Sequence, residues 1–392
     1  MRENFNVNKL KDFPKGVTDR IESPAFLVNE RLLEGNAKVL AEVRKRTGAR
    51  ILLALKAFAM HSTFPIIRKY LDGISASGPI EARLGREEFK KEVVTYAPAY
   101  SVSDIRDAIR YSDKIIFNSA AQLERYGDAV ARSGKKIELG LRVNPGHSNV
   151  KNALYNPTLP GSRLGAPYAD LSERVIRMID GLHFHALCEQ NADALVHVLD
   201  SFEKRYGKYI SRMKWVNFGG GHHITRSDYD RELLIRTINN FKRKYGVQVY
   251  LEPGEAVALN AGILVSTVLD IVHNGVDIAI LDTSAEAHMP DVLAGPYRPQ
   301  IIGAGKPGER RYTYRLGGLT CLAGDVIGDY SFQRRLKVGE RLVFLDMAHY
   351  SMVKTTTFNG VRHPSIARYN PDTGKVRIVR RFGYEDYKNR LS

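Results

Sequence analysis

The chain has 392 residues, of which 43% are hydrophobic, with a formal net charge of +16 and only two cysteines. This length exceeds that of one small domain and fits a large domain joined to a second one. No apolar run approaches 18 residues, so no transmembrane helix is expected, and the polar N-terminal stretch lacks the apolar core of a signal peptide. Two cysteines argue against a disulfide scaffold and favour a cytoplasmic location.

The positive charge raises the question of nucleic-acid binding. The basic residues are scattered, however, and the densest stretches, GERRYTYR and RIVRRF, contain no run of five. The sequence has no zinc-ligand spacing and no aromatic–basic motif of the kind that single-strand binders use. We therefore interpret the charge as a solvated basic surface that favours weak anion binding, and expect no nucleic-acid or membrane partner.

Segments rich in Val, Ile, Leu and aromatic residues recur along the first two thirds of the chain, alternating with stretches that have helical spacing. Ser101 and Ser119 are suited to begin helices, and Gly134 and Gly246 to end them. Eight strands alternating with helices predict a (βα)8 barrel, and the absence of GxGxxG after the first strand weakens the alternative of an open doubly wound sheet. The predicted strands are 50–56, 73–77, 93–97, 114–118, 136–144, 181–187, 215–219 and 248–252.

After about residue 262 the pattern changes to short strands separated by turn residues, with few helix signals. We therefore predict a barrel domain over residues 24–262 and a mostly β C-terminal domain over residues 263–392, which residues 1–23 join. The predicted strands of this domain are 262–275, 276–284, 312–318, 341–347 and 375–382.

Polar residues at the strand ends predict the chemistry of the barrel, because active sites lie at the C-terminal ends of barrel strands. Desolvation of Lys56 favours a neutral amine, which can form a Schiff base with an aldehyde. The backbone N–H groups of Gly219–Gly221 can hold a phosphate, and Glu252 can pair with a pyridine nitrogen. With His185 near the end of the sixth strand, these residues match pyridoxal 5′-phosphate, which we predict as the cofactor.

Each of these signals is weak alone. A lysine at a strand end is commonly a snorkelling surface residue, and GGG or EPG alone is a common turn. We also interpret His183 and His185 as facing opposite sides of their strand, so that one is structural and no metal site is expected. The order and placement of the signals together carry the prediction.

The same residues resemble the pyridoxal-phosphate decarboxylases of the alanine-racemase-like fold, which include the ornithine and diaminopimelate enzymes, from about residue 24 to 365. The motifs are ALKAF, GLHFH, NFGGG and LEPG. The resemblance implies that Lys56 is the Schiff-base lysine, that His185 stacks on the cofactor ring and that Glu252 pairs with its nitrogen. It also implies that the phosphate loop consists of Gly219, Gly220 and Gly221.

The C-terminal domain carries two further motifs. GGLTCLAGDVIGDY resembles the segment with a catalytic cysteine, here Cys321, and a substrate-binding aspartate, here Asp325. DMAHYSMVKTTTFNG resembles the segment whose tyrosine, here Tyr350, reaches the cofactor phosphate. In that family these residues enter the site from the partner subunit, which implies a homodimer with shared active sites. The alternative for Cys321 is a small buried hydrophobe.

One departure narrows the resemblance. Most family members have an arginine after EPG, where this chain has Glu255. With this glutamate, the sequence most resembles the branch that decarboxylates carboxynorspermidine or carboxyspermidine to norspermidine or spermidine. Two further segments support this resemblance, ASGPIEARLGREEF and AEAHMPDVLAGPYRP. Extra carboxylates suit a substrate with several ammonium groups, so Glu255, Glu286 and Asp291 are candidates for binding it, against the alternative of ordinary surface charge.

The resemblance implies a decarboxylation in which Cys321 or a nearby acid returns a proton to the α-carbon while Asp325 binds the distal amine. Two alternatives stay open. One is an amino-acid racemase, or a decarboxylase of diaminopimelate, lysine, ornithine or arginine. The other is a decarboxylase-like binding protein without activity, which the presence of Lys56, Cys321 and Asp325 argues against.

Overall fold

The computed structural model describes residues 11–392, and the expected role of residues 1–10 lies outside this part. The chain divides into two compact units. One is Glu34–Val257, and the other combines the segment up to Leu33 with Ala258–Ser392.

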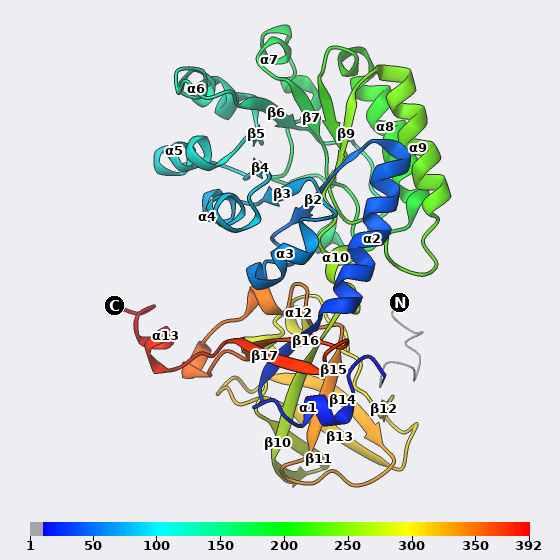
Figure 1. Cartoon of the computed structure of the whole chain (residues 1–392), viewed down its shortest axis with the longest axis vertical. Helices are drawn as coiled ribbons and strands as arrows, with labels where there is room; N and C mark the ends of the chain where they lie inside the picture. Colours follow the sequence, from blue (N-terminus) through cyan, green and yellow to red (C-terminus); the bar gives the residue numbers. More distant parts are fainter. Residues whose placement is uncertain (1–10) are drawn as a thin grey trace. The chain divides into compact units, whose positions relative to one another are not determined.

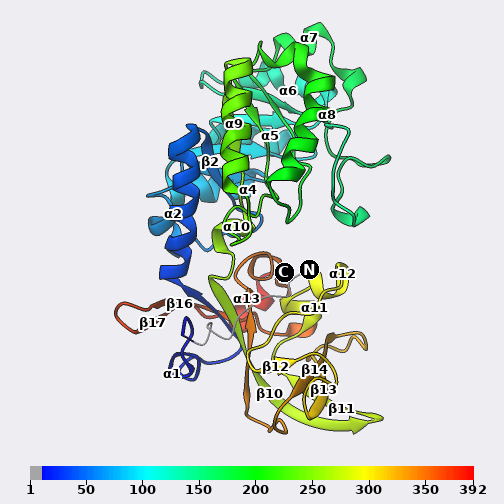
Figure 2. The same cartoon turned by 90° about the vertical axis from the view of Figure 1, so that its right-hand side faces the viewer.

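The first unit is a closed barrel of eight parallel strands, which confirms the predicted fold class. Helices lie around the outside of the strands (Figures 1 and 2). The strands are β2 Arg50–Ala54, β3 Gly73–Ala76, β4 Glu92–Tyr96, β5 Lys114–Phe117, β6 Glu138–Arg142, β7 Gly181–His183, β8 Trp215–Asn217 and β9 Gln248–Leu251.

Local signals in the sequence explain where several helices begin and end. The hydroxyls of Ser101 and Ser119 accept hydrogen bonds from backbone N–H groups in the first turns of α5 and α6. Gly246, with φ of +71°, ends α9. The helices of this part are α2 Glu30–Thr47, α3 Phe64–Ile67, α4 Pro79–Leu84, α5 Val102–Tyr111, α6 Ala120–Ala131, α7 Glu173–Arg177, α8 Ala192–Ile210, α9 Arg231–Tyr245 and α10 Glu255–Ala258.

The barrel interior is filled by side chains from several strands around Trp215. The Trp215 ring lies so close to β6 and β7 that a Cβ on Gly140 or Gly181 would come within 2.4 Å of it. These two glycines therefore make room for the indole, so the barrel is a packed core rather than a pore.

The second unit is a sheet of nine strands, which confirms the predicted mostly β domain. The strand order is β12-β14-β13-β11-β10-β1-β16-β17, and β15 pairs with β10. The pairs β1–β16 and β11–β13 are parallel, and the other pairs are antiparallel. The strands are β1 Ala25–Asn29, β10 Gly262–Asn274, β11 Val276–Leu281, β12 Ala304–Gly305, β13 Tyr312–Gly317, β14 Val326–Phe332, β15 Arg341–Leu345, β16 Ser365–Asn370 and β17 Lys375–Arg380.

The short helices of this unit are α1 Lys15–Thr18, α11 Ala285–His288, α12 Asp291–Ala294 and α13 Tyr384–Lys388. No helix in the described part of the chain is both long and apolar enough to cross a membrane.

Candidate active site

Lys56 lies two residues beyond the end of β2. Its side chain retains solvent-accessible surface, but the surrounding protein removes enough hydration to lower the pKa of the ammonium group. The positive charge of Arg142 lowers this pKa further, while Glu252 and Glu81 act in the opposite direction. The net effect favours the neutral amine, which is the nucleophilic form.

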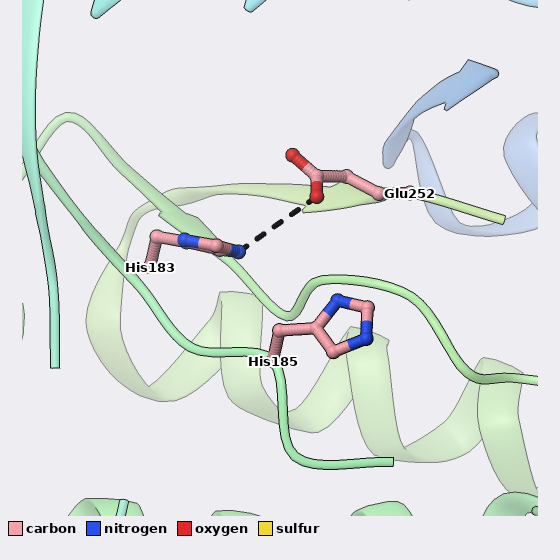
Figure 3. A group of neighbouring side chains, drawn as sticks. All are labelled: His183, His185 and Glu252. Carbon is pink, nitrogen blue, oxygen red and sulfur yellow. Dashed lines mark ion pairs between the residues drawn. The ribbon is translucent and has the colours of Figure 1, made fainter. Parts of the chain in front are cut away.

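His183, His185 and Glu252 form a cluster at the ends of β7 and β9 (Figure 3). One ligand atom from each of the three side chains lies within 4.8 Å of the others, and His183 Nε2 is 3.7 Å from Glu252 Oε2. The expectation that the two histidines face opposite sides was wrong, because residues two apart along an extended chain share a face.

The electrostatics of this cluster follow from its burial. Burial and the positive charges of Arg142 and Lys56 lower the pKa of both histidines well below the usual range, so both rings are neutral at pH 7. Burial also raises the pKa of Glu252, although a hydrogen bond from Asn217 opposes the shift. A buried carboxylate of this kind is stabilised by a ligand that brings a positive charge to it.

The glycine loop after β8 is held by hydrogen bonds to a side chain of β8 and to a side chain that follows β7. Gly219 N–H donates to Asn217 Oδ1 at 2.9 Å, and Gly220 N–H donates to His185 Nδ1 at 3.0 Å. Gly221 has φ of +84°, and a Cβ there would lie 2.0 Å from the carbonyl oxygen of Leu187. Among the described contacts the N–H of Gly221 has no protein acceptor, so it stays available to a ligand.

Arg142 is a buried guanidinium at the end of β6 that our sequence analysis missed. Its Nη2 donates to the carbonyl oxygen of His185 at 3.1 Å, and its guanidinium carbon lies 4.8 Å from the centre of the Tyr96 ring. Asn217 was also missed. Both residues have a signal in the sequence, because each is polar and ends a buried strand, in LGLRVNPG and WVNFGGG.

Glu255 begins α10 and faces a histidine. Its Oε2 lies 3.2 Å from Nε2 of the buried His223. A ligand atom of Glu189, which follows β7, completes a trio whose members lie within 4.8 Å of one another. The predicted role of Glu255 in substrate binding stays a prediction.

In the second unit, Cys321 is exposed and its N–H donates to Asn359 Oδ1 at 2.7 Å. The alternative that Cys321 is a small buried hydrophobe is therefore wrong. Asp325 is 5% exposed, and both of its carboxylate oxygens accept hydrogen bonds from residues of the same unit. Its predicted contact with a substrate amine stays a prediction.

The remaining candidates of the second unit differ in their surroundings. Tyr350 has φ of +51°, a strained conformation of the sort that clusters at functional sites. Asp291 is paired with Lys354 at 2.6 Å. Glu286 is partly exposed, and its carboxylate has no hydrogen bond or ion pair within the part of the chain that the structure describes.

The model of a family described as "Pyridoxal-dependent decarboxylase, C-terminal sheet domain" matches residues 25–348. The chain belongs to the pyridoxal-dependent decarboxylases. Pyridoxal 5′-phosphate is therefore its cofactor, as the sequence predicted. The predicted enzyme class, a decarboxylase dependent on this cofactor, is likewise confirmed.

Two curated relatives cover almost the whole chain. The carboxynorspermidine/carboxyspermidine decarboxylase of Campylobacter jejuni is 45% identical over 95% of this chain and 99% of its own. The carboxyaminopropylagmatine decarboxylase of Synechocystis is 44% identical over 99% of each chain. The crystal structure of carboxynorspermidine decarboxylase from Campylobacter jejuni, complexed with norspermidine, has a TM-score of 0.87 at 44% identity and covers 94% of this chain and 100% of its own.

Proposed function

We propose that this decarboxylase removes carbon dioxide from carboxynorspermidine and carboxyspermidine. The observation that carries the proposal is the 45% identity, over nearly the full length of both chains, to an enzyme named for these substrates. A second relative so named, from Herminiimonas arsenicoxydans, is 39% identical over 95% of this chain. The products are the corresponding polyamines, norspermidine and spermidine.

The barrel residues fit the cofactor. Lys56 combines a lowered pKa with access to solvent, so it would link to the aldehyde. Glu252 is a buried carboxylate with a raised pKa that would pair with the ring nitrogen, and Gly220 fixes the imidazole of His185 for packing against the ring. When bound, the cofactor supplies an electron sink for the pair of electrons left on the α-carbon.

The second unit carries two further residues to which we assign a role. Cys321, whose thiol is exposed, would return a proton to the α-carbon, and Tyr350 would contact the cofactor phosphate. We propose that the chain forms a homodimer in which the second unit of one subunit serves the barrel of the other. Two free cysteines support a cytoplasmic location.

Substrate recognition requires carboxylates that can face ammonium groups. Glu286 suits this task best among the candidates, because it is partly exposed and its carboxylate has no cationic partner among the described residues. Asp291 and Glu255 are already paired, with Lys354 and His223, so a substrate ammonium would have to compete with these contacts.

A second candidate substrate is carboxyaminopropylagmatine, because a relative named for it is 44% identical over 99% of this chain. Agmatine ends in a guanidinium group, which presents a planar fork of donors, whereas a polyamine ends in a compact ammonium group. The two candidates therefore differ in what the distal carboxylates must bind.

The deciding experiment is an absorbance spectrum of the purified protein, followed by carbon dioxide release from the three carboxylated substrates. We expect a near-visible band that borohydride removes, and the highest kcat/KM with carboxynorspermidine or carboxyspermidine. A preference for carboxyaminopropylagmatine would replace the proposed substrate. A protein that binds the cofactor but releases no carbon dioxide from any substrate would favour the inactive binding protein.

A further inference from the structure

The carboxylate of Asp325 accepts several hydrogen bonds, all from residues of its own unit. Oδ1 accepts from the backbone N–H groups of Ala285 at 2.7 Å and Glu286 at 3.2 Å. Oδ2 accepts from the hydroxyl of Ser284 at 2.8 Å, and from the hydroxyl and N–H of Thr320 at 2.7 Å and 3.1 Å. Five donors thus surround one buried carboxylate.

These contacts leave no room for a substrate ammonium. A carboxylate offers about four lone-pair positions, and five donors already share them here. The chain also packs tightly around the group, because a Cβ on Gly318 would lie 2.3 Å from Asp325 Oδ2. Binding a distal amine would require Asp325 to break contacts that hold its own unit together.

The two segments that Asp325 joins each carry a residue with a proposed role. One is the loop of Thr320 and Cys321. This loop is also held by Asn359, whose Oδ1 accepts a hydrogen bond from the Cys321 N–H at 2.7 Å. The other is the start of α11, which carries Glu286. A shift of either segment would move the thiol or the carboxylate away from its place.

We infer that Asp325 is a positioning residue that joins the Cys321 loop to α11, and that Glu286 rather than Asp325 binds the distal ammonium of the substrate. The inference rests on the proposed function for the roles of Cys321 and Glu286. The contacts that define the anchor do not depend on it.

Hydrogen exchange tests the anchor. In Asp325→Asn we expect faster amide exchange in residues 284–286 and 320–321 together, because one substitution weakens both attachments. Asp329→Asn is the matched control, since Asp329 lies on β14 and pairs with Arg315 at 2.9 Å on the surface. Unchanged exchange, or a rise in only one segment, would overturn the inference.

A milder variant covers the case in which Asp325→Asn does not fold. Thr320→Val removes one hydroxyl donor and leaves the carboxylate in place. We expect a smaller rise in exchange, again in both segments, and a rise confined to residues 320–321 would contradict the joint anchor.

Kinetics with two substrates separate positioning from binding. The first is carboxynorspermidine, and the second is an analogue whose distal amine is replaced by a methyl group. Asp325→Asn should lower kcat by the same factor for both, whereas Glu286→Gln should raise KM about 10- to 100-fold for the amine-bearing substrate alone, the loss expected for one charge-assisted hydrogen bond. A KM rise in Asp325→Asn that is selective for the amine-bearing substrate and persists in the Glu286→Gln background would return the binding role to Asp325, because a shift of α11 acts through the Glu286 carboxylate and has no such effect once that carboxylate is removed. If the unsubstituted protein releases no carbon dioxide, the proposed function fails, while the exchange experiment still decides the anchor.

Discussion

The side-chain amide of Asn217, at the end of β8, donates a hydrogen bond to Oε1 of Glu252, just after β9, at 2.7 Å. The same amide group accepts the N–H of Gly219 through its oxygen. Asn217 therefore fixes the carboxylate and the glycine loop relative to each other. The other carboxylate oxygen of Glu252, Oε2, faces His183. A shift of this side chain would therefore disturb both the carboxylate and the glycine loop of the proposed cofactor site.

Replacing Glu252 by Gln should lower kcat about 10²- to 10³-fold, the usual effect of removing one preorganised electrostatic partner. Gln has nearly the same size as Glu, and its side-chain oxygen can still accept the hydrogen bond from Asn217. It cannot carry the negative charge that a protonated pyridine nitrogen requires. Steady-state kinetics give kcat and KM. Glu92→Gln is the control, because Glu92 begins β4 at the opposite end of the barrel and pairs with Arg50 and Lys114. Equal losses in the two variants would argue against a special role for Glu252.

Lys56→Ala should abolish both the near-visible band and turnover, because it removes the amine that would link to the aldehyde. Lys56→Arg is the matched variant, since it keeps a long basic side chain but not a nucleophilic amine. Both variants should retain the wild-type unfolding midpoint in the absence of cofactor, which thermal unfolding measures. Turnover at the native rate in either variant would sink the assignment of Lys56.

The barrel was predictable because each of its strands is buried and bounded by turn or helix signals. The residues at which the strands end were harder to predict from the sequence. The predicted strand 181–187 ends at His183 in the structure, because the chain then leaves the sheet and His185 is held by the glycine loop. The strands β1, β12, β14 and β16 were not predicted, and the parallel pairing of β1 with β16 joins segments more than 300 residues apart.

The missed site residues show where sequence reasoning stops. Lys56 and Glu252 stood out through their motifs, whereas Arg142 and Asn217 act through contacts that only the closed barrel creates. Asp325 illustrates the opposite case, because its motif suggested a ligand contact while its neighbours occupy the carboxylate. A motif identifies a conspicuous residue, but only the surrounding donors show which of its atoms are still free.

Mixed dimers test the proposal that two subunits share each active site. Lys56→Ala and Cys321→Ala should each be inactive or nearly so, the second by about 10²- to 10⁴-fold if it removes a general acid. Dimers that contain one subunit of each variant should recover about half of the wild-type activity, because one of their two sites is intact. Activity is measured on dimers purified through two different tags. Mixed dimers with no recovered activity would show that both residues must come from one subunit.

Stability should fall in mild acid because of His288. Its ring is buried, with Nε2–H donating to the carbonyl oxygen of Arg362 at 3.0 Å and Nδ1 accepting the N–H of Ser284 at 3.3 Å. Burial lowers the pKa of His288 from 6.5 to about 4. Between these values the unfolded chain binds a proton that the folded chain does not, so the free energy of unfolding decreases as the pH falls.

This effect should reach about 2 kcal/mol at pH 5 and approach about 3 kcal/mol below pH 4. His288→Gln cannot take up the proton and should lose this part of the pH dependence, although it is less stable than the wild type at pH 7.5 because the ring contacts are gone. Urea unfolding of both proteins at pH 7.5, 6 and 5 measures the difference. The two curves of unfolding free energy should converge toward pH 5, and parallel curves would show that His288 does not stay neutral in the folded protein.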